Sequence, residues 1–435
     1  MTAPATSRDT GFFGHPRGLS TLFFTEMWER FSYYGMRGFL ILYMTKALGF
    51  TDQHAGLSYG NYVSAVWFTP ILGGLIADRW LGHYRSVLLG GAIIALGHFT
   101  LAFPPLPFFY AGLTLIVIGT GLLKPNISTL VGSLYAPGDE RRDAGFSIFY
   151  MGINLGAFLG PLIAGKLAEG VDWHLGFACA GVGMVFGLIQ YVVGRGRLQP
   201  AIERLAARPR PAADGTAVAA PLTGDDWRRI AAVVVLFVFA SLFWGAYEQA
   251  GSTLNLFVDR YVNLEFLGIK LYASWFVSIQ AGFVILLSPF FAWLWIRLGA
   301  RQPSSPAKFA FALVFVGLAF VLLMPAGALA QTGVKVSPLW LVGAFFIQEL
   351  GELCLSPVGL SVVTKLSPVR LVGLLMGVFF LSNSAGNWLA GWSARFISTM
   401  PLVQLFGTTA AVTIGAGVVL FLLLRPIRGL MGGVR

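Results

Sequence analysis

The sequence predicts an all-α membrane protein whose helices cross the bilayer many times, and three observations lead to this prediction. Hydrophobic residues make up 56% of the 435 residues and charged residues only 11%, whereas soluble domains carry roughly 25% charged residues. Apolar runs of the about 20 residues that a bilayer-spanning helix needs recur along the whole chain. Most Lys and Arg residues lie on one side of these runs, which is the pattern that orients membrane proteins.

Twelve apolar runs are expected to form transmembrane helices, in two groups of six. They cover residues 19–47, 57–80, 85–103, 107–131, 144–168 and 175–194, then 229–256, 270–298, 307–325, 338–364, 371–397 and 404–425. We therefore predict an N-terminal six-helix bundle at 1–194, a cytoplasmic linker at 195–228 and a C-terminal six-helix bundle at 229–435. The linker is rich in Arg, Ala and Pro. Its stretch AIERLAA fits two turns of a surface helix, and the rest is expected to be flexible.

The distribution of Lys and Arg predicts the orientation in the membrane. With the N-terminus in the cytoplasm, the cytoplasmic segments hold 21 of the 30 Lys and Arg residues, the outer segments six and the spans three. Both termini are therefore expected in the cytoplasm. The polar N-terminal stretch lacks the apolar core and cleavage site of a signal peptide, so no segment is expected to be removed. The same bias accounts for the net charge of +11 without nucleic acid.

The first span carries four charged residues within twelve positions: Glu26, Glu29, Arg30 and Arg37. Ionisable groups at membrane depth are costly, and they usually face a water-filled cavity on a transport pathway. Helical periodicity places Glu26, Arg30, Tyr33 and Arg37 along one stripe, with Glu29 to one side. The alternative is a Glu26–Arg30 pair at spacing i,i+4 that serves only helix packing. Four charges exceed what packing requires.

Four further charged residues lie inside other spans and away from the span ends: Lys124, Glu248, Glu349 and Glu352. Lys124 is mid-span, too far from either end to reach the membrane interface. The first half of the chain thus contributes three cations and two anions to the membrane interior, and the second half contributes three anions. This asymmetry predicts a cavity with a cationic side and an anionic side, which suits a zwitterion, or salt bridges between the halves that form and break.

Several uncharged residues inside the spans have two interpretations. Asn154 is either a contact for a substrate amide or the partner in an interhelical hydrogen bond. Trp244 and Tyr247 either line a cavity or pack in the core. Cys179 and Cys354 both lie in apolar runs, so neither a disulfide framework nor a metal site is expected.

Short motifs along the chain resemble those of one transporter family. EMWERFSYYG at 26–35 resembles the first-helix signature E-x-x-E-R-F-x-Y-Y-G of the proton-dependent oligopeptide transporters of bacterial type, within the major facilitator superfamily. Further similar stretches follow in the family's order: GGLIADRWLG at 73–82, GTGLLKPN at 119–126, FYMGINLGAF at 149–158, FWGAYEQAGS at 243–252 and GELCLSP at 351–357. The resemblance implies the major facilitator fold, with its two six-helix bundles, as a multi-pass protein of a bacterial cytoplasmic (inner) membrane.

The resemblance also implies which residues bind a peptide. Arg30, Arg37 and Lys124 would hold the peptide carboxylate, and Glu352 would hold the amino terminus. The rest of the expected substrate-binding set is Tyr33, Tyr34, Asn154, Trp244 and Gln280.

The resemblance also implies which residues couple transport to protons and which form salt bridges between the two halves of the chain. Glu26, Glu29 and Glu248 would form the proton-coupling group. Salt bridges between the halves would pair Arg37 with Glu248 and Lys124 with Glu352.

Four features depart from the family pattern. Gln280 stands where an eighth-helix Asn is expected, and Phe379 stands where an eleventh-helix Trp is usual. Gly60 occupies the position of a second-helix His in animal relatives, so proton coupling is expected to rest on carboxylates. The linker is too short for the extra helical hairpin that is common in bacterial members.

The function expected from these observations is proton-coupled import of di- and tripeptides by alternating access. The alternative is a carrier for another small solute, such as an amino acid, nitrate or a drug, although a nitrate carrier would not need the anionic Glu352. An enzyme is not expected, because no His stands beside a mid-span carboxylate pair and no H-E-x-x-H motif occurs. The expected partners are peptides, protons and the lipid bilayer. No nucleic acid, metal or cofactor is expected, and the chain is expected to act as a monomer.

Overall fold

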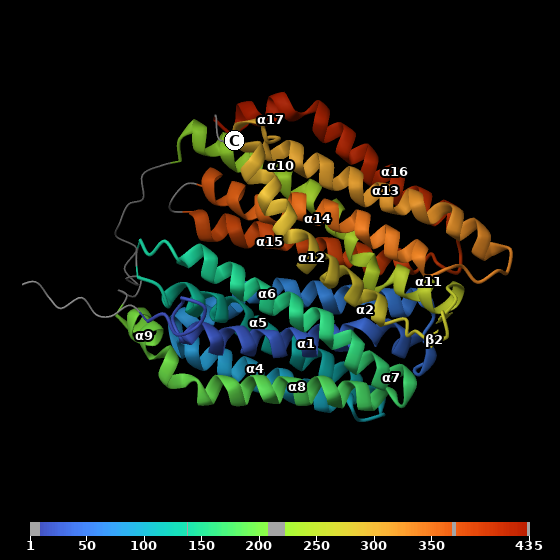
Figure 1. Ribbon diagram of the computed structural model, residues 1–435, viewed down its shortest axis with the longest axis horizontal. Helices are drawn as coiled ribbons and strands as arrows, with labels where there is room; N and C mark the ends of the chain where they lie inside the picture. Colours follow the sequence, from blue (N-terminus) through green and yellow to red (C-terminus); the bar gives the residue numbers. More distant parts are fainter. Residues whose placement is uncertain (1–8, 137, 208–221, 368–370, 433–435) are drawn as a thin grey trace, which may run out of the picture. The chain divides into compact units, whose positions relative to one another are not determined.

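The computed structural model describes residues 9–136, 138–207, 222–367 and 371–432, which are almost entirely helical (Figure 1). Contacts between residues divide the chain into two compact units. Unit 1 comprises Met1–Met36, Thr69–Ala168 and His174–Thr216, and unit 2 comprises Arg37–Phe68, Glu169–Trp173 and Ala217–Arg435. The first helix, α1 (Gly18–Lys46), begins in unit 1 and ends in unit 2.

Unit 1 holds most of the helices that the first group of apolar runs predicts. Besides the start of α1 they are α3 (Pro70–Ile76), the π-helical turn η1 (Ala77–Leu81), α4 (His83–Leu101), α5 (Leu106–Ser133), α6 (Arg142–Gly160), the π-helical turn η2 (Pro161–Gly165), most of α7 (Lys166–Gly170) and of α8 (Trp173–Val193), and α9 (Arg195–Ala206). α4 packs along α5, and α3 also contacts α5.

The core of unit 1 is built from apolar residues of α1, α4, α5 and α8, which include the fully buried Leu19, Ile127 and Met184. Leu198 and Ala201 of α9 are 0% exposed in the same core. The sequence predicts only a two-turn surface helix here, whereas the structure has a twelve-residue helix with a buried face. Residues 208–221 of the predicted linker lie outside the described residues.

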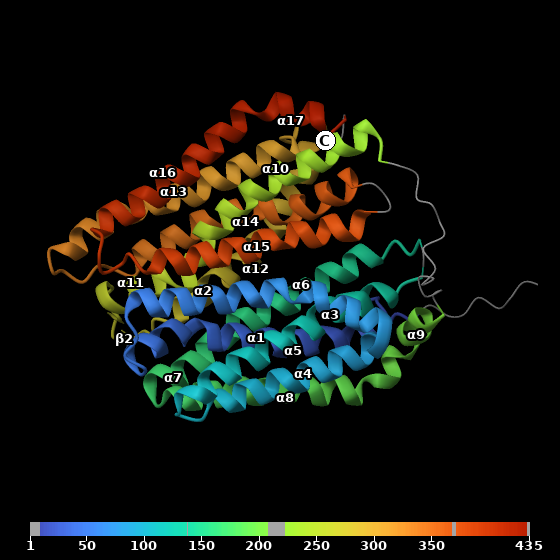
Figure 2. The same ribbon diagram turned by 180° about the vertical axis from the view of Figure 1, so that it is seen from behind.

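Unit 2 holds the end of α1 and the helices of the second group of apolar runs. They are α2 (Asp52–Phe68), α10 (Gly224–Tyr247), the 3-10 turn η3 (Glu248–Gly251), α11 (Thr253–Tyr261), the strands β1 (Glu265–Phe266) and β2 (Ile269–Lys270), α12 (Trp275–Leu298), the 3-10 turn η4 (Gly299–Arg301), α13 (Ser305–Gln331), α14 (Leu339–Leu366), α15 (Val372–Ala394), α16 (Leu402–Leu422) and α17 (Leu424–Leu430). α13 packs against both α14 and α16, and α2 packs along α15 (Figure 2). The two strands form a short antiparallel hairpin.

The stretch GLSYG at 56–60 matches the pattern G-x-S-x-G of serine hydrolases, but it lies inside helix α2. A nucleophilic serine of that class needs a sharp turn from a strand into a helix. Gly56 and Gly60 instead face the backbone of α15 at Gly391. The motif therefore serves helix packing.

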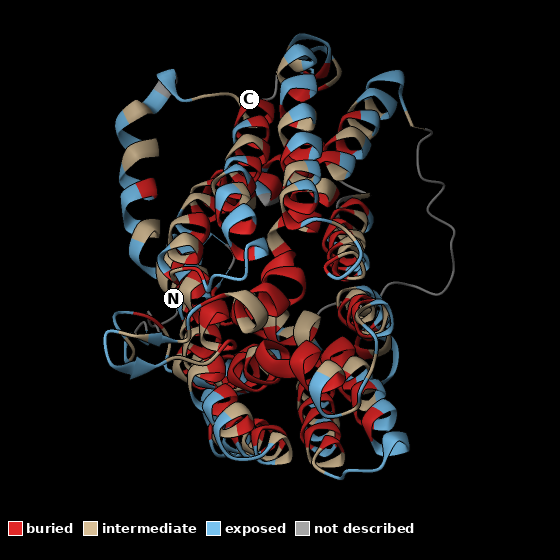
Figure 3. Ribbon diagram, turned by 90° about the vertical axis from the view of Figure 1, so that its right-hand side faces the viewer, coloured by how far each residue is buried: buried red, intermediate tan, exposed pale blue. Residues whose placement is uncertain are grey.

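The surfaces of the helices are those of a membrane protein. Among the described residues, nine helices are long and apolar enough to cross a bilayer. α1 fails that criterion because every 18-residue stretch of it contains at least three charged residues. Large apolar side chains are widely exposed, including Leu286 at 70%, Ile296 at 82% and Leu422 at 76%. Exposed and buried positions are interspersed along the helices (Figure 3). The apolar surface that the exposed positions present is favourable only against lipid or protein.

Candidate functional site

A buried cation in α1 is shared by two carboxylates of the same helix in unit 1. Arg30 is 2% exposed, and its Nε lies 3.2 Å from Oε1 of Glu26. The same Nε donates to Oε2 of Glu29, which is 0% exposed. The guanidinium also lies over the ring of Tyr33, at 5.2 Å from the centroid, and Tyr33 packs edge-on against Tyr34. The E-x-x-E-R-F-x-Y-Y-G stretch thus forms one compact ionic and aromatic cluster.

A row of glycines on α6 allows that cluster to be buried. Gly152, Gly156 and Gly160 recur at every fourth position, so they lie on one face of the helix. A Cβ on Gly156 would lie 2.1 Å from the carbonyl oxygen of Met27 and 2.9 Å from Cβ of Arg30. Small residues at this spacing let membrane helices approach closely. The glycine at 156 therefore lets α6 exclude water from the backbone that carries Arg30.

Lys124 is half-buried on α5, immediately before Pro125, and interacts electrostatically with Glu26. The next residue, Asn126, is 1% exposed and anchors this part of the helix. Its Nδ2 donates to the carbonyl oxygens of Leu122 at 2.7 Å and Gly73 at 3.3 Å. These bonds hold α5 next to α3 at the proline, where one backbone hydrogen bond is missing. Lys124 consequently has a fixed backbone position.

Asn154 is 8% exposed, and its Nδ2 donates to the carbonyl oxygen of Tyr150 at 3.0 Å, within its own helix α6. This hydrogen bond therefore stays within α6 and does not join two helices.

In unit 2, Arg37 of α1 forms an ion pair with Glu248, which begins the turn η3. Arg37 is 4% exposed and Glu248 is 6% exposed. Nε of Arg37 donates to the hydroxyl of Tyr59 in α2 at 2.6 Å. A Cβ on Gly251 would lie 2.0 Å from that hydroxyl, so the close approach of η3 to Tyr59 requires glycine.

The other predicted residues of unit 2 lie on α10, α12 and α14. Glu352 is 6% exposed, and its Oε1 accepts a hydrogen bond from Ser356 at 2.6 Å. Gln280 donates from Nε2 to Oε1 of Gln348 at 2.9 Å, so it is tied to α14. Trp244 packs edge-on against Tyr247, with ring centroids 5.4 Å apart.

Phe379, the second departure from the family pattern, is 4% exposed on α15. A Cβ on Gly359 of α14 would lie 2.8 Å from its ring, and Phe309 lies 6.4 Å away between ring centroids. This phenylalanine is part of the packing between helices.

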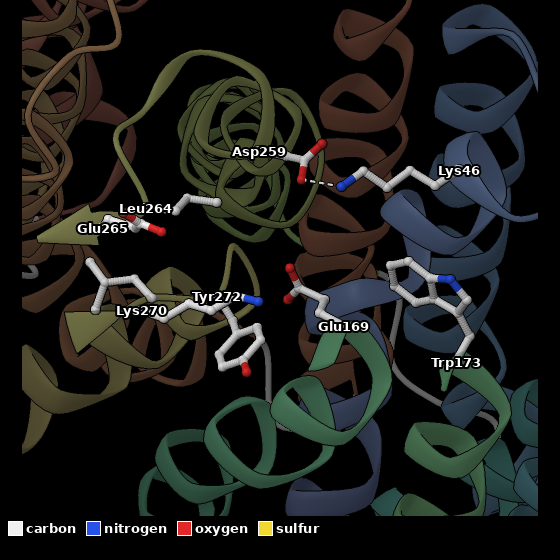
Figure 4. A pocket seen from close by; sticks show the side chains of 9 residues that line it. Lys46, Glu169, Trp173, Asp259, Leu264, Glu265, Lys270 and Tyr272 are labelled. Atoms are coloured by element: carbon white, nitrogen blue, oxygen red, sulfur yellow. Dashed lines mark hydrogen bonds and ion pairs between the residues drawn. The ribbon is translucent and has the colours of Figure 1, made fainter. Parts of the chain in front are cut away.

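A charged cavity of about 260 Å³ opens in unit 2 beside the hairpin (Figure 4). Lys46 at the end of α1 forms an ion pair of 2.5 Å with Asp259 of α11. Glu169 points to the same cavity and accepts hydrogen bonds from the backbone N–H groups of Ala273 and Ser274 at 3.1 and 2.9 Å. Of the charged groups that line the cavity, Lys46 and Asp259 are thus paired with each other, and Glu169 is held by backbone N–H groups.

A second ion pair of unit 2 joins α2 to α11. Arg260 donates to both carboxylate oxygens of Asp52, at 2.8 and 2.5 Å, and Ser398 donates to the same carboxylate. Burial by itself would raise the pKa of Asp52, but the hydrogen bonds from Arg260 and Ser398 hold that pKa below its ordinary value of 3.8. The pair therefore favours the ionised carboxylate at neutral pH.

The structure brings together some of the residues that the sequence singled out and adds others. Arg30 meets Glu26 and Glu29, and Arg37 meets Glu248. Lys124 and Glu352 belong to different units, so their pairing stays a prediction. The sequence did not predict that Tyr59 accepts a hydrogen bond from Arg37, or that Tyr247 donates one to Glu349. It also did not predict the hydrogen bond of Gln280 with Gln348 or that of Ser356 with Glu352. No local motif signals these contacts, except that Ser356 is one helical turn from Glu352.

Comparison with known proteins gives one consistent result. The sequence profile of the POT family matches residues 84–202 and 217–412. The chain is 40% identical to an uncharacterized transporter of Bacillus subtilis, over 98% of this chain and 96% of that protein. It is 36% identical to a peptide transporter of Yersinia enterocolitica, over 100% and 99% of the two chains. It is 37% identical to a di-/tripeptide transporter of Lactococcus lactis, over 98% of each.

Solved structures agree with the sequence relatives. A POT peptide transporter crystallised with sulfate matches with a TM-score of 0.91 and 39% identity, over 98% of this chain and 97% of that one. A POT family transporter in complex with 5-aminolevulinic acid matches with a TM-score of 0.88 and 30% identity, over 97% and 98%.

Proposed function

The chain belongs to the POT family of transporters, and on that premise we propose that it imports di- and tripeptides together with protons by alternating access. One observation in particular supports proton-coupled binding of an anionic group, namely that buried Arg30 is shared by Glu26 and Glu29. Relatives at 36% and 37% identity are named peptide and di-/tripeptide transporters. The family and the buried charges thus support the same class of substrate.

The coupling follows from competition for a cation. A peptide carboxylate that binds Arg30 draws the guanidinium away from Glu26 and Glu29. A carboxylate that loses its cation in a poorly hydrated site is costly as an anion, so it takes up a proton. Binding of peptide and binding of protons are therefore linked without covalent chemistry. Release of the peptide on the other side restores the ion pairs and expels the proton.

The role of each residue in this scheme is a proposal. Arg30, Arg37 and Lys124 hold the peptide carboxylate, and Glu352 holds the amino terminus. The remaining contacts come from Tyr33, Tyr34, Asn154, Trp244 and Gln280.

Protons bind to Glu26, Glu29 and Glu248, and the pairs Arg37–Glu248 and Lys124–Glu352 open and close during the cycle. The present ion pair of Arg37 with Glu248 supports the first of these pairings.

We also propose how the chain is arranged in the cell. Residues 1–194 and 229–435 act as the two moving bundles, joined by the linker at 195–228. The protein lies in a bacterial cytoplasmic membrane with both termini in the cytoplasm, and it works as a monomer with no cofactor besides the coupling proton.

Uptake of labelled dialanine into proteoliposomes tests the proposed function. An inward proton gradient should drive accumulation, an uncoupler should abolish it, and unlabelled di- and tripeptides should compete. Empty liposomes and liposomes without a gradient are the controls. Uptake that ignores the gradient would contradict proton coupling. Competition by free amino acids, 5-aminolevulinic acid or nitrate, but not by peptides, would favour a carrier for another small solute.

A further inference from the structure

Glu349 of α14 is a fully buried carboxyl group for which the proposed transport cycle has no role. It is 0% exposed. Its Oε1 accepts a hydrogen bond from the hydroxyl of Tyr247 at 2.7 Å. Its Oε2 is also buried and has no hydrogen-bond partner among the residues that the structure describes. One oxygen of a buried carboxyl group is thus left with an unused hydrogen-bonding position.

The charged groups that act on Glu349 are all acidic. Glu352 lies three residues further along α14, and Glu248 follows Tyr247 directly at the start of η3. Both interact electrostatically with Glu349, and no cation does so among the described residues. Glu248 is already paired with Arg37, and Glu352 accepts its bond from Ser356. A charged Glu349 would therefore be a buried anion beside two other acidic groups, which is costly without a paired cation.

We propose that Glu349 carries a transported proton on Oε2, in addition to the protons carried by the α1 carboxylates, and that Tyr247 links this proton site to the Arg37–Glu248 pair. The proposal rests on the proposed function, because it adds one site to the same proton-coupled cycle. A proton on Oε2 removes the cost of a buried negative charge beside two acidic groups, and it leaves Oε1 free to accept from Tyr247.

The position of Tyr247 explains how binding and release of this proton are timed. Tyr247 is the last residue of α10, and the 3-10 turn begins at Glu248. An opening of the Arg37–Glu248 pair in which Glu248 moves would also displace Tyr247, because the two residues are adjacent in the chain. The bond from this hydroxyl favours the ionised form of Glu349, so a change in that bond changes the affinity of Glu349 for its proton. The carboxylate takes up one proton from the outer solution and gives up one proton to the cytoplasmic solution in each cycle.

The number of protons moved per peptide tests the proposal. Proteoliposomes are set with a dialanine gradient and a series of opposing membrane potentials, and the potential at which net flux stops gives the proton-to-peptide ratio. Glu349→Gln keeps the oxygen that accepts from Tyr247 but cannot bind a proton. We expect the ratio to fall by one relative to the wild type. The control is Glu265→Gln, an exposed carboxylate on β1, which should leave the ratio unchanged.

A second variant keeps the test decisive if Glu349→Gln does not fold. Tyr247→Phe retains the carboxyl group and removes only the hydroxyl that favours its ionised form. The external pH at half-maximal uptake should then move upward by about one unit, as the loss of one hydrogen bond to a charged group predicts, while the proton-to-peptide ratio stays at the wild-type value. An unchanged pH profile would overturn the assigned link.

The two failures are distinguishable. If the wild-type protein takes up dialanine without regard to the gradient, the proposed function fails. If the wild type is proton-coupled and folded Glu349→Gln has the wild-type ratio, only the role of Glu349 is overturned.

Discussion

Two carboxylates, those of Glu26 and Glu29, contact Arg30. Replacing one of them by a neutral side chain separates their roles. Glu29 is 0% exposed and bonds directly to Nε of Arg30. Glu29→Gln keeps the shape of the side chain and removes the titratable proton. We expect gradient-driven uptake of dialanine to fall at least about tenfold. A loss of only about 1.4 kcal/mol in coupling free energy is enough for a tenfold change. Counterflow, which exchanges peptide without net proton movement, should persist in part.

Arg30→Ala is the matched comparison for Glu29→Gln. It leaves two buried carboxylates without their cation, at a cost of about 3–5 kcal/mol, and it removes the proposed carboxylate contact. Gradient-driven uptake and counterflow should both be lost in a sample that remains monodisperse. Full gradient-driven accumulation by Glu29→Gln would remove Glu29 from the proton-coupling group and move the role to Glu26 or Glu248.

At the scale of single residues, the sequence predicts contacts within a helix better than contacts between helices. Glu26 and Arg30 are four residues apart, so helical geometry alone places them together. Tyr59 is 22 residues from its partner Arg37, and Tyr247 is 102 residues from Glu349. Those pairs depend on which helix packs against which, and an isolated tyrosine in an apolar run carries no signal for its partner.

At the scale of the elements, the close packing of α6 on α1 predicts an effect of adding a single methyl group. Gly156→Ala places a Cβ 2.1 Å from the carbonyl oxygen of Met27. Backbone atoms cannot yield as side chains do, so we expect a loss of about 3 kcal/mol in folding stability. Thermal unfolding in detergent measures the effect, and transport by any folded fraction should fall because the backbone at Arg30 is displaced.

Gly415 provides the control for this substitution. It also lies inside a helix, α16, but a Cβ there would have no neighbour within 4 Å. Gly415→Ala should be neutral or raise stability by about 0.5–1 kcal/mol, the usual gain for alanine over glycine in a helix. Equal melting temperatures for Gly156→Ala and the wild type would mean that α6 does not pack on α1 as described.

The ion pair between α2 and α11 predicts a pH dependence of stability. The pKa of Asp52 is lower in the folded protein than its ordinary value of 3.8. Its stabilisation is therefore complete above about pH 3.8 and is lost as the pH falls through the lower folded pKa. Asp52→Asn should lower stability by about 1 kcal/mol near neutral pH. The difference in melting temperature between Asp52→Asn and the wild type should begin to shrink below about pH 3.8 and should vanish only below the lower folded pKa. A difference that grows as the pH falls below 3.8 would contradict the assignment.

Helix positions were predictable from the sequence, but the interruptions within helices were not. Each of the twelve predicted runs overlaps a helix among the described residues, although some runs extend a few residues beyond it, because hydropathy reports length and apolarity directly. The π-helical turns at Ala77–Leu81 and Pro161–Gly165 and the 3-10 turn at Glu248–Gly251 interrupt helices inside or at the ends of those runs. An apolar run continues through such turns without a change of composition. The turn at Glu248 matters most, because it positions the carboxylate that binds Arg37.

At the scale of the whole molecule, the all-α membrane fold is confirmed, and it follows from composition and span count. The grouping of residues by contact is harder to anticipate. Residues Arg37–Phe68 belong to the same compact unit as Ala217–Arg435. This grouping depends on contacts such as that of Gly60 with Gly391, 331 positions away in the sequence. Hydropathy cannot indicate which two helices will approach to backbone contact.

The orientation of the chain in the membrane is the broadest prediction, and single cysteines test it. The bias of 21 cytoplasmic against six outer Lys and Arg residues places Lys166 outside and Arg85 and Arg301 inside. All three positions are exposed. In a background in which Cys179 and Cys354 are replaced by serine, an impermeant maleimide should label Lys166→Cys in intact cells. It should label Arg85→Cys and Arg301→Cys only after the membrane is permeabilised.

Retained uptake of dialanine shows that each single-cysteine variant is folded. The opposite labelling pattern would reverse the orientation, and the charge bias would then need another cause. Labelling of Arg85→Cys on one side and Arg301→Cys on the other would mean an odd number of spans between them. That result would contradict the two groups of six, because the predicted segments at both positions lie on the cytoplasmic side. The expected pattern would place the acid-outside gradient on the Lys166 side, the side from which an importer must take its peptide and protons.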